Sequence, residues 1–553
     1  MGENNSSEFT VNYGDKLPHK TRSLCPECTR IIDAIVYEED GKVLIKKTCP
    51  VHGEVVDTYW ESAELYERAR KYLAKEVKLT NTNTGKFLGH RGENCPFDCG
   101  LCPNHKSHTA LCNIAVTNVC DLSCWYCFFY AKKGDPIYEP SIEQIRFMLS
   151  NLRNQKPIAP NAIQITGGEP TIRDDIVEIV RQARLIGFEH VQLNTHGINF
   201  ATNPDIVGEL RDAGMSTVYM SFDGTTSKTN PKNHWEVPYS IDSMRKAKVG
   251  AVLVPTVIRG INDNDLGNIV NFALNNIDVV RGVNFQPVSL VGRMPRKERE
   301  SQRITIPGAI QNIEEQTNRT ITKEDWFPIP CVAPVTDFVE ALTEKPQYNL
   351  SNHFACGAAT YLYLDKEKNK VTPLPQFLDV EGLREYLSEK TSEIREGRNR
   401  KIIGAKVLLK LNSFIDKEKQ PKELKFGNLL YNALVKHSYD ALGEIHYKML
   451  FLGMMHFQDK YNYDVERVQR CNIHYVMADG RIVPFCSFNV IPEIYRDKVQ
   501  NEYSNSFEDW EKKTGKNLSE IKYKRDINFL ESGDVYKNAY NNLINYFAGG
   551  SSI

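Results

Sequence analysis

Fourteen cysteines constrain this 553-residue chain more than any other feature of its sequence. The N-terminal stretch is polar and has no apolar signal segment, so we expect a protein of the cytoplasm. In that reducing compartment, cysteines indicate metal sites rather than disulfides. Their spacing divides them into four groups, and each group predicts a metal site of its own.

One group has an unusual number of ligands. The stretch "CDLSCWYCFF" contains Cys120, Cys124 and Cys127, with no fourth cysteine nearby. A cubane iron–sulfur cluster normally takes four thiolates, so three would leave one iron with an open coordination position. Open positions on metals usually mark chemistry, whereas closed sites are structural. We therefore predict that these three cysteines hold the catalytic cluster.

The first group predicts a closed mononuclear site. Two knuckles, "CPEC" and "CPVHG", supply Cys25, Cys28, Cys49 and His52, with a strand-like segment between them. Three thiolates and one imidazole at this spacing are typical of a tetrahedral zinc or iron ribbon of rubredoxin type. Because all four ligands come from the protein, we expect a structural role.

The second group lies in one loop, "CPFDCGLCPNHKSHTALC". Four thiolates this close together can hold one closed cluster. A second zinc site is the alternative, and His105 or His108 of the same loop could replace a cysteine. The predicted ligands are Cys95, Cys99, Cys102 and Cys112.

The fourth group is dispersed over the last part of the chain. The stretch "CNIHYVMADGRIVPFC" predicts a hairpin with its turn at Asp479, which places Cys471 and Cys486 near its ends. Cys331 and Cys356 would join them in a folded domain as ligands of one more cluster. The alternative for Cys331 and Cys356 is that they are buried cysteines without a metal.

A glycine-rich turn follows the cysteine trio. "AIQITGGEPTIRDDI" predicts a buried strand, a turn and a helix start, in which Gly167 and Gly168 permit close backbone approach and Glu169 supplies a carboxylate. Trio and turn together resemble the radical SAM superfamily. The resemblance implies that S-adenosylmethionine (SAM) chelates the open iron while this turn and Glu169 hold its amine. Reductive cleavage of SAM would then yield a radical that abstracts hydrogen from carbon.

Strand candidates recur downstream at "HVQLNTHG", "TVYMSFDG", "AVLVPTVIRG" and "GVNFQPVS", with helical stretches between them. This α/β pattern predicts a partial parallel (β/α)6 barrel, with function at the carboxyl ends of its strands. The N-terminal ribbon and a C-terminal auxiliary-cluster domain would flank the barrel. By position and by the resemblance, the residues expected to contact SAM are Asn194, Thr195, Ser221, Asp223 and Asn262.

The run from Cys95 to Phe128, with the ribbon and the late hairpin, is similar to the archaeal tetraether lipid synthase family, earlier described as methylases of the methanopterin precursor. The resemblance implies that two C–H bonds at the tail ends of archaeal glycerophospholipids are broken and one C–C bond joins the tails. A cluster sulfur would hold the first alkyl radical. The implied cofactors are three [4Fe–4S] clusters, one mononuclear zinc or iron, and SAM. The implied electron donor is a ferredoxin or flavodoxin.

Two other functions remain open at this point. One is a radical SAM methylase acting on a pterin, and the other is a non-enzymatic iron–sulfur electron carrier. The balance of 69 Lys and Arg against 70 Asp and Glu gives no support for a nucleic-acid partner. Apolar runs are too short to span a membrane. Residues 402–415 are apolar with basic flanks, which fits either a helix in peripheral contact with a membrane or a core helix.

We expect four units along the chain. They are a rubredoxin-like metal-binding domain (1–85), an auxiliary-cluster connector (86–113), the radical SAM partial barrel (114–300) and the C-terminal auxiliary-cluster domain (301–553).

Overall fold

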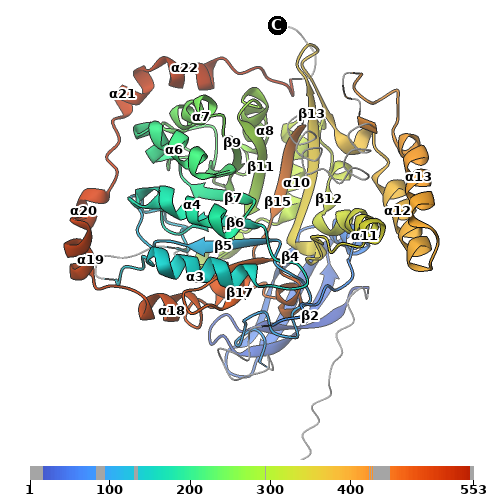
Figure 1. The fold of residues 1–553 in the computed structure, drawn as a ribbon, viewed down its shortest axis with the longest axis horizontal. Coiled ribbons are helices and arrows are strands. Elements are labelled where there is room, and N and C mark those ends of the chain that lie inside the picture. The colour runs from blue at the N-terminus through green and yellow to red at the C-terminus, as the bar shows by residue number, and fades with distance from the viewer. Residues whose placement is uncertain are drawn as a thin grey trace, which may run out of the picture.

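The computed structural model describes residues 16–82, 94–129, 135–292, 294, 296–422, 424, 426–427 and 449–548 (Figure 1). The polar N-terminus considered above lies outside these residues. Within them, no helix is long and apolar enough to cross a membrane.

The ribbon is a four-stranded antiparallel sheet in the order β1-β2-β3-β4. Its central hairpin turns at Asp40 and Gly41, whose φ angles of 50° and 73° suit the tight turn between two twisted strands. Alternating side chains of the two central strands face inward, so one side of the sheet is buried. The strands are β1 (His19–Leu24), β2 (Ile31–Glu39), β3 (Lys42–Cys49) and β4 (Gly53–Trp60), and helix α1 (Ala63–Arg70) follows.

The barrel is built from six parallel strands in chain order, each paired with the next. The central residues of these strands form near-continuous apolar runs, because helices cover the outer face of the sheet. This arrangement confirms the predicted partial (β/α)6 barrel. The strands are β5 (Leu111–Ala115), β6 (Ala162–Thr166), β7 (His190–Thr195), β8 (Thr217–Ser221), β9 (Gly250–Val254) and β11 (Val280–Pro287).

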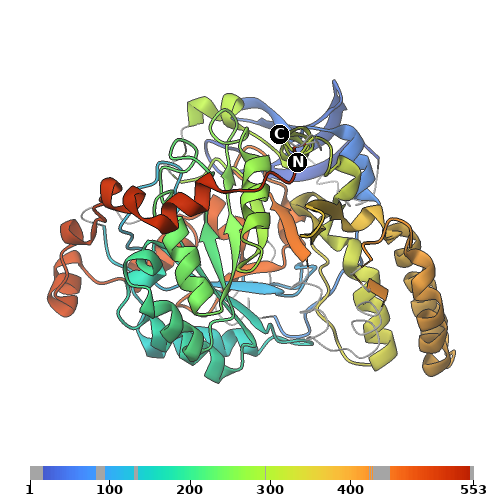
Figure 2. The ribbon, with the colours of Figure 1, turned by 90° about the horizontal axis from the view of Figure 1, so that it is seen from above.

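Amphipathic helices form the outer layer around this sheet (Figures 1 and 2). In α4, for example, Ile176, Ile179, Val180 and Ala183 share one face and are buried. Gly187 ends this helix in the left-handed conformation, with φ 103°. The helices are α3 (Ile142–Arg153), α4 (Ile176–Ile186), α5 (Ile198–Thr202), α6 (Asp205–Ala213), α7 (Val237–Lys246), α8 (Leu266–Asn275), α9 (Arg299–Gln302) and α10 (Ile306–Gln316).

The C-terminal part of the chain completes the same sheet at both edges. Strand β15 (Met449–Met455) pairs in parallel with β11, and β16 (Ile473–Val476) pairs in parallel with β5. The sheet then continues into antiparallel strands on each side. The expected boundary at residue 300 therefore divides the chain but not the sheet. The remaining strands are β10 (Thr256–Val257), β12 (Phe327–Pro328), β13 (Gly357–Asp365), β14 (Lys370–Pro373) and β17 (Ile482–Pro484).

Three helices pack beside this sheet around a second apolar core: α11 (Ala333–Thr343), α12 (Val380–Arg395) and α13 (Arg400–Leu411). The apolar segment of residues 402–415 falls mostly in α13. It buries Ile403, Val407 and Leu411 as a core helix would, yet leaves Ile402 57% and Leu409 87% exposed.

Residues 496–548 run along the outside of the barrel (Figure 1). Contacts such as Tyr239 Oη to Leu530 O, at 2.7 Å, and Asn271 Nδ2 to Ile544 O, at 2.9 Å, attach this tail to α7 and α8. Its helices are α18 (Arg496–Glu502), α19 (Phe507–Thr514), α20 (Leu518–Ile521), α21 (Ile527–Ser532) and α22 (Asp534–Asn541). Two short helices that precede this tail, α16 (Val465–Gln469) and α17 (Phe485–Val490), are buried.

A buried ion triad joins the ribbon, the barrel and the C-terminal segment. Arg303 Nε lies 2.8 Å from Asp57 Oδ1 of β4, and its Nη2 lies 3.0 Å from Asp459 Oδ2, beyond β15. Asp459 also accepts a hydrogen bond from Leu290 N of the barrel, at 3.0 Å. Burial raises the pKa of Asp57, whereas the Arg303 charge opposes that rise.

We predict that Arg303→Met destabilises the protein by about 3–5 kcal/mol, because it leaves buried Asp459 without its paired cation and leaves Asp57 with Arg299 alone. Calorimetry should show a clear fall in the thermal midpoint. Arg319→Met is the matched control, because Arg319 is 77% exposed in its pair with Glu314 and should contribute less than about 1 kcal/mol. Equal midpoints for the two variants would contradict the bridging role of Arg303.

Candidate active site and metal centres

The cysteine trio lies in the loop that follows β5, at the carboxyl end of the barrel strands. All three side chains are partly exposed and line a cavity of about 240 Å³. Backbone groups hold the sulfurs in place: Leu122 N–H and Phe129 N–H donate to Cys120 Sγ and Cys127 Sγ, each at 3.4 Å. Three thiols that share one cavity fit the cluster with an open iron that the spacing predicts.

The two glycines hold the turn after β6 against this loop. Gly168 N–H donates to Thr117 O at 2.7 Å, and Glu169 N–H donates to Val119 O at 2.8 Å. A Cβ on Gly167 would lie 2.2 Å from Thr117 O, and one on Gly168 would lie 2.0 Å from Val119 O. The structure therefore shows the close approach that the sequence predicts, made to the backbone that leads into the cysteine loop.

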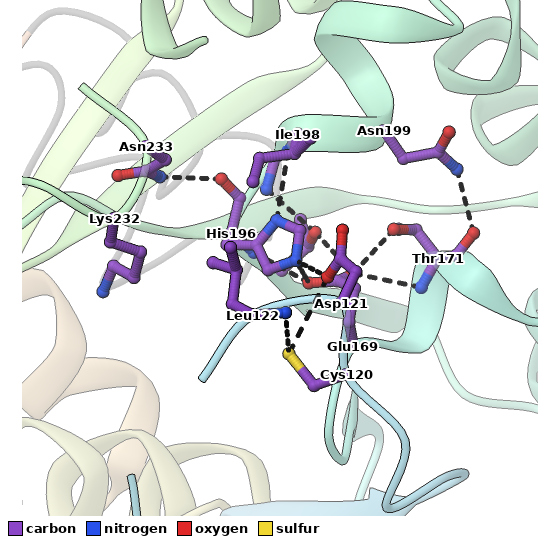
Figure 3. A network of polar contacts seen from close by, with 12 residues as sticks. Cys120, Asp121, Leu122, Glu169, Thr171, His196, Ile198, Asn199, Lys232 and Asn233 are labelled. Atoms are coloured by element: carbon purple, nitrogen blue, oxygen red, sulfur yellow. Dashed lines mark hydrogen bonds and ion pairs between the residues drawn. The ribbon is translucent and has the colours of Figure 1, made fainter. Parts of the chain in front are cut away.

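The carboxylate of Glu169 is 1% exposed and held by hydrogen bonds within the protein (Figure 3). Its Oε1 accepts from Thr171 N, Thr171 Oγ1 and Thr195 Oγ1, at 3.0, 2.7 and 2.7 Å. Its Oε2 accepts from His196 N at 3.0 Å. Glu169 also lines the cavity, as do both glycines, so its predicted contact with a SAM amine remains a proposal.

His196, which the sequence did not single out, lies between Glu169 and the cluster loop (Figure 3). Its Nδ1 accepts from Ile198 N at 3.1 Å, so its Nε2 carries the hydrogen donated to Asp121 Oδ1 at 2.6 Å. Cys120, Asp121 and His196 place ligand atoms within 4.8 Å of one another. Cys120 is expected to bind the cluster as part of the trio. We therefore assign to His196 the role of positioning the cysteine loop through its hydrogen bond to Asp121.

Lys232 is a second residue that sequence reasoning missed. Its Nζ lies 2.8 Å from Asp223 Oδ2 and 3.1 Å from Tyr126 Oη, and Tyr126 Oη also donates to Asp223. Burial lowers the pKa of Lys232, but Asp223 and the Cys124 thiolate raise it more, so the amine stays charged. Burial raises the pKa of Cys124, and the Lys232 charge opposes that rise. The charge of Lys232 therefore favours the thiolate form of Cys124 at the expected cluster position.

The five residues expected to contact SAM separate into two sets. Asn194, Thr195 and Ser221 line the 240 Å³ cavity. Asp223 and Asn262 line a neighbouring cavity of about 390 Å³, and Cys124, Tyr126 and Lys232 line both.

Several of these side chains already have partners within the protein. Asn262 Oδ1 accepts from Ile258 N at 2.8 Å, while its Nδ2 donates to Asp223 O and Thr256 O. Asp223 Oδ1 accepts from Thr256 N at 2.9 Å. Asn262 thus braces the turn after β9, and direct SAM contacts by either residue remain proposals.

The C-terminal segment supplies an apolar wall of the 240 Å³ cavity that the cysteine trio lines. Phe457 and Phe485 stack with ring centroids 4.0 Å apart, and Phe128 of the cluster loop contacts Phe485 edge-on at 6.2 Å. Met455, at the end of β15, and Ile473, at the start of β16, extend this wall. A chain segment distant in sequence thus covers the cluster loop from the opposite side.

The ribbon site has the geometry of a mononuclear metal. His52 Nδ1 lies 3.5 Å from Cys25 Sγ and 3.6 Å from Cys49 Sγ, and Cys28 Sγ lies 3.9 Å from Cys49 Sγ. Ligands of a tetrahedral zinc are about 3.8 Å apart, given Zn–S bonds of about 2.3 Å. Hydrogen bonds from the backbone at Val51 and His52 lower the pKa of Cys49 to about 6, which favours the thiolate that a metal requires. The four predicted ligands are therefore brought together.

Three of the four cysteines in the second group meet. Cys95, Cys99 and Cys102 line a small cavity, and a hydrogen bond from Cys95 lowers the pKa of Cys99. Among the described residues lining this cavity, Cys112 is absent. It lies on β5 with its Sγ–H directed at Asn113 O, 3.6 Å away.

His105 lines this cavity with the three cysteines. Its Nε2 donates to Cys471 O at 2.7 Å, and burial lowers its pKa to about 4, so the ring is neutral. The lone pair on Nδ1 is therefore free of a proton, as metal binding requires. Of the ligands that the sequence left open, His105 lines this cavity, whereas Cys112 and His108 are not among the described residues that line it.

The dispersed group is also brought together only in part. The thiols of Cys356, Cys471 and Cys486 lie close enough to influence one another electrostatically. The predicted hairpin is confirmed, with β16 and β17 paired and Gly480 in its turn at φ 87°. Cys331 lies on a short 3₁₀ helix, η4 (Ile329–Val332), where Arg384 is the charge that acts on its thiol.

Comparison with known proteins identifies the class. A model described as the radical SAM superfamily matches residues 114–273, and one described as an HMPTM N-terminal zinc ribbon domain matches residues 17–61. A 7,8-dihydro-6-hydroxymethylpterin dimethyltransferase of Methanocaldococcus jannaschii is 46% identical over 505 residues, covering 89% of this chain and 97% of that relative. This chain belongs to that family of radical SAM enzymes. The alternative of a non-enzymatic electron carrier is therefore wrong.

More distant similarities cover only parts of the enzyme. A probable GTP 3′,8-cyclase of Methanothermobacter marburgensis is 33% identical over 177 residues, which is 31% of this chain and 55% of that relative. A solved structure titled anSMEcpe with bound AdoMet is 19% identical, covers 32% of this chain and 50% of the other, and has a TM-score of 0.25.

Radical SAM membership implies one [4Fe–4S] cluster with SAM on its open iron, and the site fits both. The trio supplies three thiols in one cavity, and the glycine turn lines the same cavity. Buried Lys232 provides positive charge next to the thiolate. The sequence did not identify His196 and Lys232, because each lies in an irregular loop after a strand. The residues around each of them form no pattern that indicates a binding site.

We predict that Gly168→Ala prevents cluster assembly at the trio, because the new Cβ would collide with a backbone oxygen that cannot move without the loop. Iron and sulfide analysis after anaerobic reconstitution should show the loss of about four irons. Gly208→Ala in α6 is the matched control, since nothing lies within 4 Å of its Cβ position. Full cluster content in Gly168→Ala would contradict the packing role of the turn.

Proposed function

We propose that this radical SAM enzyme joins the tail ends of two archaeal glycerophospholipid isoprenoid chains through a new C–C bond. The observation that carries the proposal is the apolar wall of the active-site cavity. Phe128, Met455, Phe457 and Phe485 present apolar surface beside the cysteine trio. The end of an alkyl chain has no polar group, so it can be bound only through contact between apolar surfaces. The resemblance of the cysteine run to the tetraether lipid synthase family supports the same substrate class.

The surface of α13 supports a substrate drawn from a membrane. Ile402 and Leu409 are exposed apolar side chains on this short helix. Basic residues that lie near them in the sequence would attract anionic lipid headgroups. The two apolar side chains would then enter the boundary between headgroups and acyl chains. These basic residues are Arg400, Lys401, Lys406 and Lys410. Peripheral contact with a lipid surface is therefore part of the proposal.

The chain's own residues would position and enclose the reaction. When bound, the reduced cluster and SAM supply a radical that removes one hydrogen atom from an unactivated carbon. The trio and the glycine turn fix where that chemistry occurs, and the stacked Phe457 and Phe485 exclude water from it. Each coupling removes two hydrogen atoms and therefore consumes two SAM molecules. A ferredoxin or flavodoxin is the proposed source of electrons.

Pterin methylation is the second candidate, and two observations favour it. The relative at 46% identity carries the name of a pterin dimethyltransferase. In addition, amide side chains line the same cavity, and Asn284 Nδ2 and Asn489 Oδ1 have no hydrogen-bond partner among the described atoms. Buried amide groups of this kind could pair with the edge of a pterin ring.

The two functions give different products. We expect reduced, reconstituted enzyme with SAM and archaeal glycerophospholipid to yield a coupled lipid lacking two hydrogens, with about two 5′-deoxyadenosines per coupling. Parallel reactions contain either the lipid or a dihydropterin, and mass spectrometry identifies the products of each. A methylated pterin together with unchanged lipid would establish the second candidate and overturn the first.

Cys124→Ala should abolish 5′-deoxyadenosine formation with either substrate, because the trio would lose one of the three ligands that hold its cluster. Chromatographic assay of SAM cleavage checks this. Ser123→Ala is the matched control, because the exposed Ser123 lies next to Cys124 and its hydroxyl accepts a hydrogen bond from Lys522 Nζ at 2.9 Å. SAM cleavage at the wild-type rate by Cys124→Ala would show that the trio is not the catalytic ligand set.

A further inference from the structure

The C-terminal tail crosses the loop that carries the cysteine trio. Lys522 Nζ donates to Cys120 O at 3.2 Å and to Leu122 O at 2.9 Å. The same ammonium donates to Ser123 Oγ at 2.9 Å. One exposed lysine of the tail therefore holds three groups of the cysteine loop, and the two segments share one surface.

Two further contacts fasten this part of the tail along the carboxyl ends of the barrel strands. Lys516 Nζ donates to Ile172 O at 3.0 Å, in the turn that follows β6. Arg525 Nη2 donates to Lys232 O at 2.7 Å, in the segment that follows β8. Residues 516–525, which we call the strap, therefore run past the loops that follow β6, β5 and β8.

The strap is basic, although the chain as a whole is nearly neutral. Its sequence, "KNLSEIKYKR", contains four basic residues and one acidic residue, whereas the net charge of the chain is −1. Lys522 and Lys524 are exposed. Exposed Lys228, in the loop after β8, lines the 390 Å³ cavity together with Arg525 of the strap. Positive charge therefore gathers on this side of the cysteine loop.

An exposed aromatic side chain lies next to these charges. Trp125, which stands between two cysteines of the trio in the sequence, is 40% exposed. It lines the 390 Å³ cavity with Cys124 and with Ile261, which is 41% exposed. Exposed apolar side chains with charged residues around them are typical of surfaces that bind another protein. Cys124 also lines the active-site cavity, so this surface leads directly to the expected cluster.

The described residues cover the opposite side of the cysteine loop. There the stacked rings of Phe457 and Phe485 form a wall across a cavity of about 240 Å³. A cavity of that size admits a small molecule and is far too small for a protein. A protein that delivers an electron to the trio therefore approaches from the side of the strap.

We propose that the strap, Trp125 and Lys228 form the docking surface for an acidic protein that carries a low-potential electron. The basic side chains steer this carrier to the surface, and Trp125 supplies a central apolar contact. The carrier loses one electron, the cluster held by the trio gains it, and each SAM cleavage consumes one. The proposal rests on the radical SAM chemistry that both candidate functions share, so it holds for either substrate.

Calorimetric titration at low ionic strength with a flavodoxin of net negative charge tests binding. Lys228→Glu combined with Lys524→Glu should raise the dissociation constant about tenfold or more, because two charge reversals replace attraction by repulsion. The matched control is Lys366→Glu with Lys370→Glu, at two exposed positions of the β13–β14 hairpin. This hairpin lies beside the first residues of β15, at the opposite end of the barrel strands from the strap. Equal dissociation constants for wild type and the strap variant would overturn the proposal.

Formation of 5′-deoxyadenosine, measured at saturating SAM without lipid or pterin, tests electron delivery. With reduced flavodoxin as donor, the strap variant should lose about tenfold or more of kcat/KM for the donor. With photoreduced 5-deazariboflavin, a small uncharged donor, its rate should equal that of wild type. Equal losses with the two donors would show damage to the cluster site and would rule out the docking role. Because neither candidate substrate is present, failure of the proposed function leaves this result unaffected.

A membrane surface is the competing partner, because basic residues also attract anionic lipids. Cosedimentation with anionic phospholipid vesicles should show equal binding by wild type and the strap variant. If the strap variant loses vesicle binding yet keeps full affinity for flavodoxin, the surface is a membrane contact and the proposal fails.

Discussion

The active site depends on a backbone contact between two adjacent strand ends. The glycine turn after β6 donates hydrogen bonds to Thr117 and Val119, which lead from β5 into the cysteine loop. Side chains at Gly167 and Gly168 would occupy the space that these carbonyls fill. Because β5 and β6 are paired in parallel, this contact fixes the height of the loop above the barrel. This backbone contact therefore sets the positions of the cavity, of the Glu169 carboxylate and of His196.

A second constraint is that the barrel is not closed by its own six strands. β15 and β16, from the C-terminal part, continue the parallel sheet at opposite edges. The residues that follow β15 and flank the β16–β17 hairpin therefore reach the cavity from the side opposite the cluster loop. The apolar wall of Phe457 and Phe485 and the thiols of Cys471 and Cys486 come from this closure. The apolar wall and these two thiols thus share one structural origin.

Buried charge accompanies each junction between the parts of the chain. Arg303 joins carboxylates of the ribbon and the C-terminal segment at the barrel edge. Lys232 neutralises Asp223 next to the catalytic thiols. The guanidinium of buried Arg467 interacts with the thiols of Cys356 and Cys486. In each place the low dielectric of the interior makes the pairing strong and an unpaired partner costly, so these charges specify how the parts fit.

By itself, the sequence determined the features that are local. Ligands of the ribbon site and the catalytic trio lie within short stretches, and turn chemistry together with spacing was enough to identify them. Strand and helix periodicity likewise predicted the six-unit barrel. Only the tertiary structure decided which distant residues share a site. It placed His105, and not Cys112, among the residues lining the cavity of Cys95, Cys99 and Cys102, and it brought His196 and Lys232 to the trio. The physical reason is that the pairing of β16 with β5 and of β15 with β11 sets these distances, and no local pattern records which strand a segment joins.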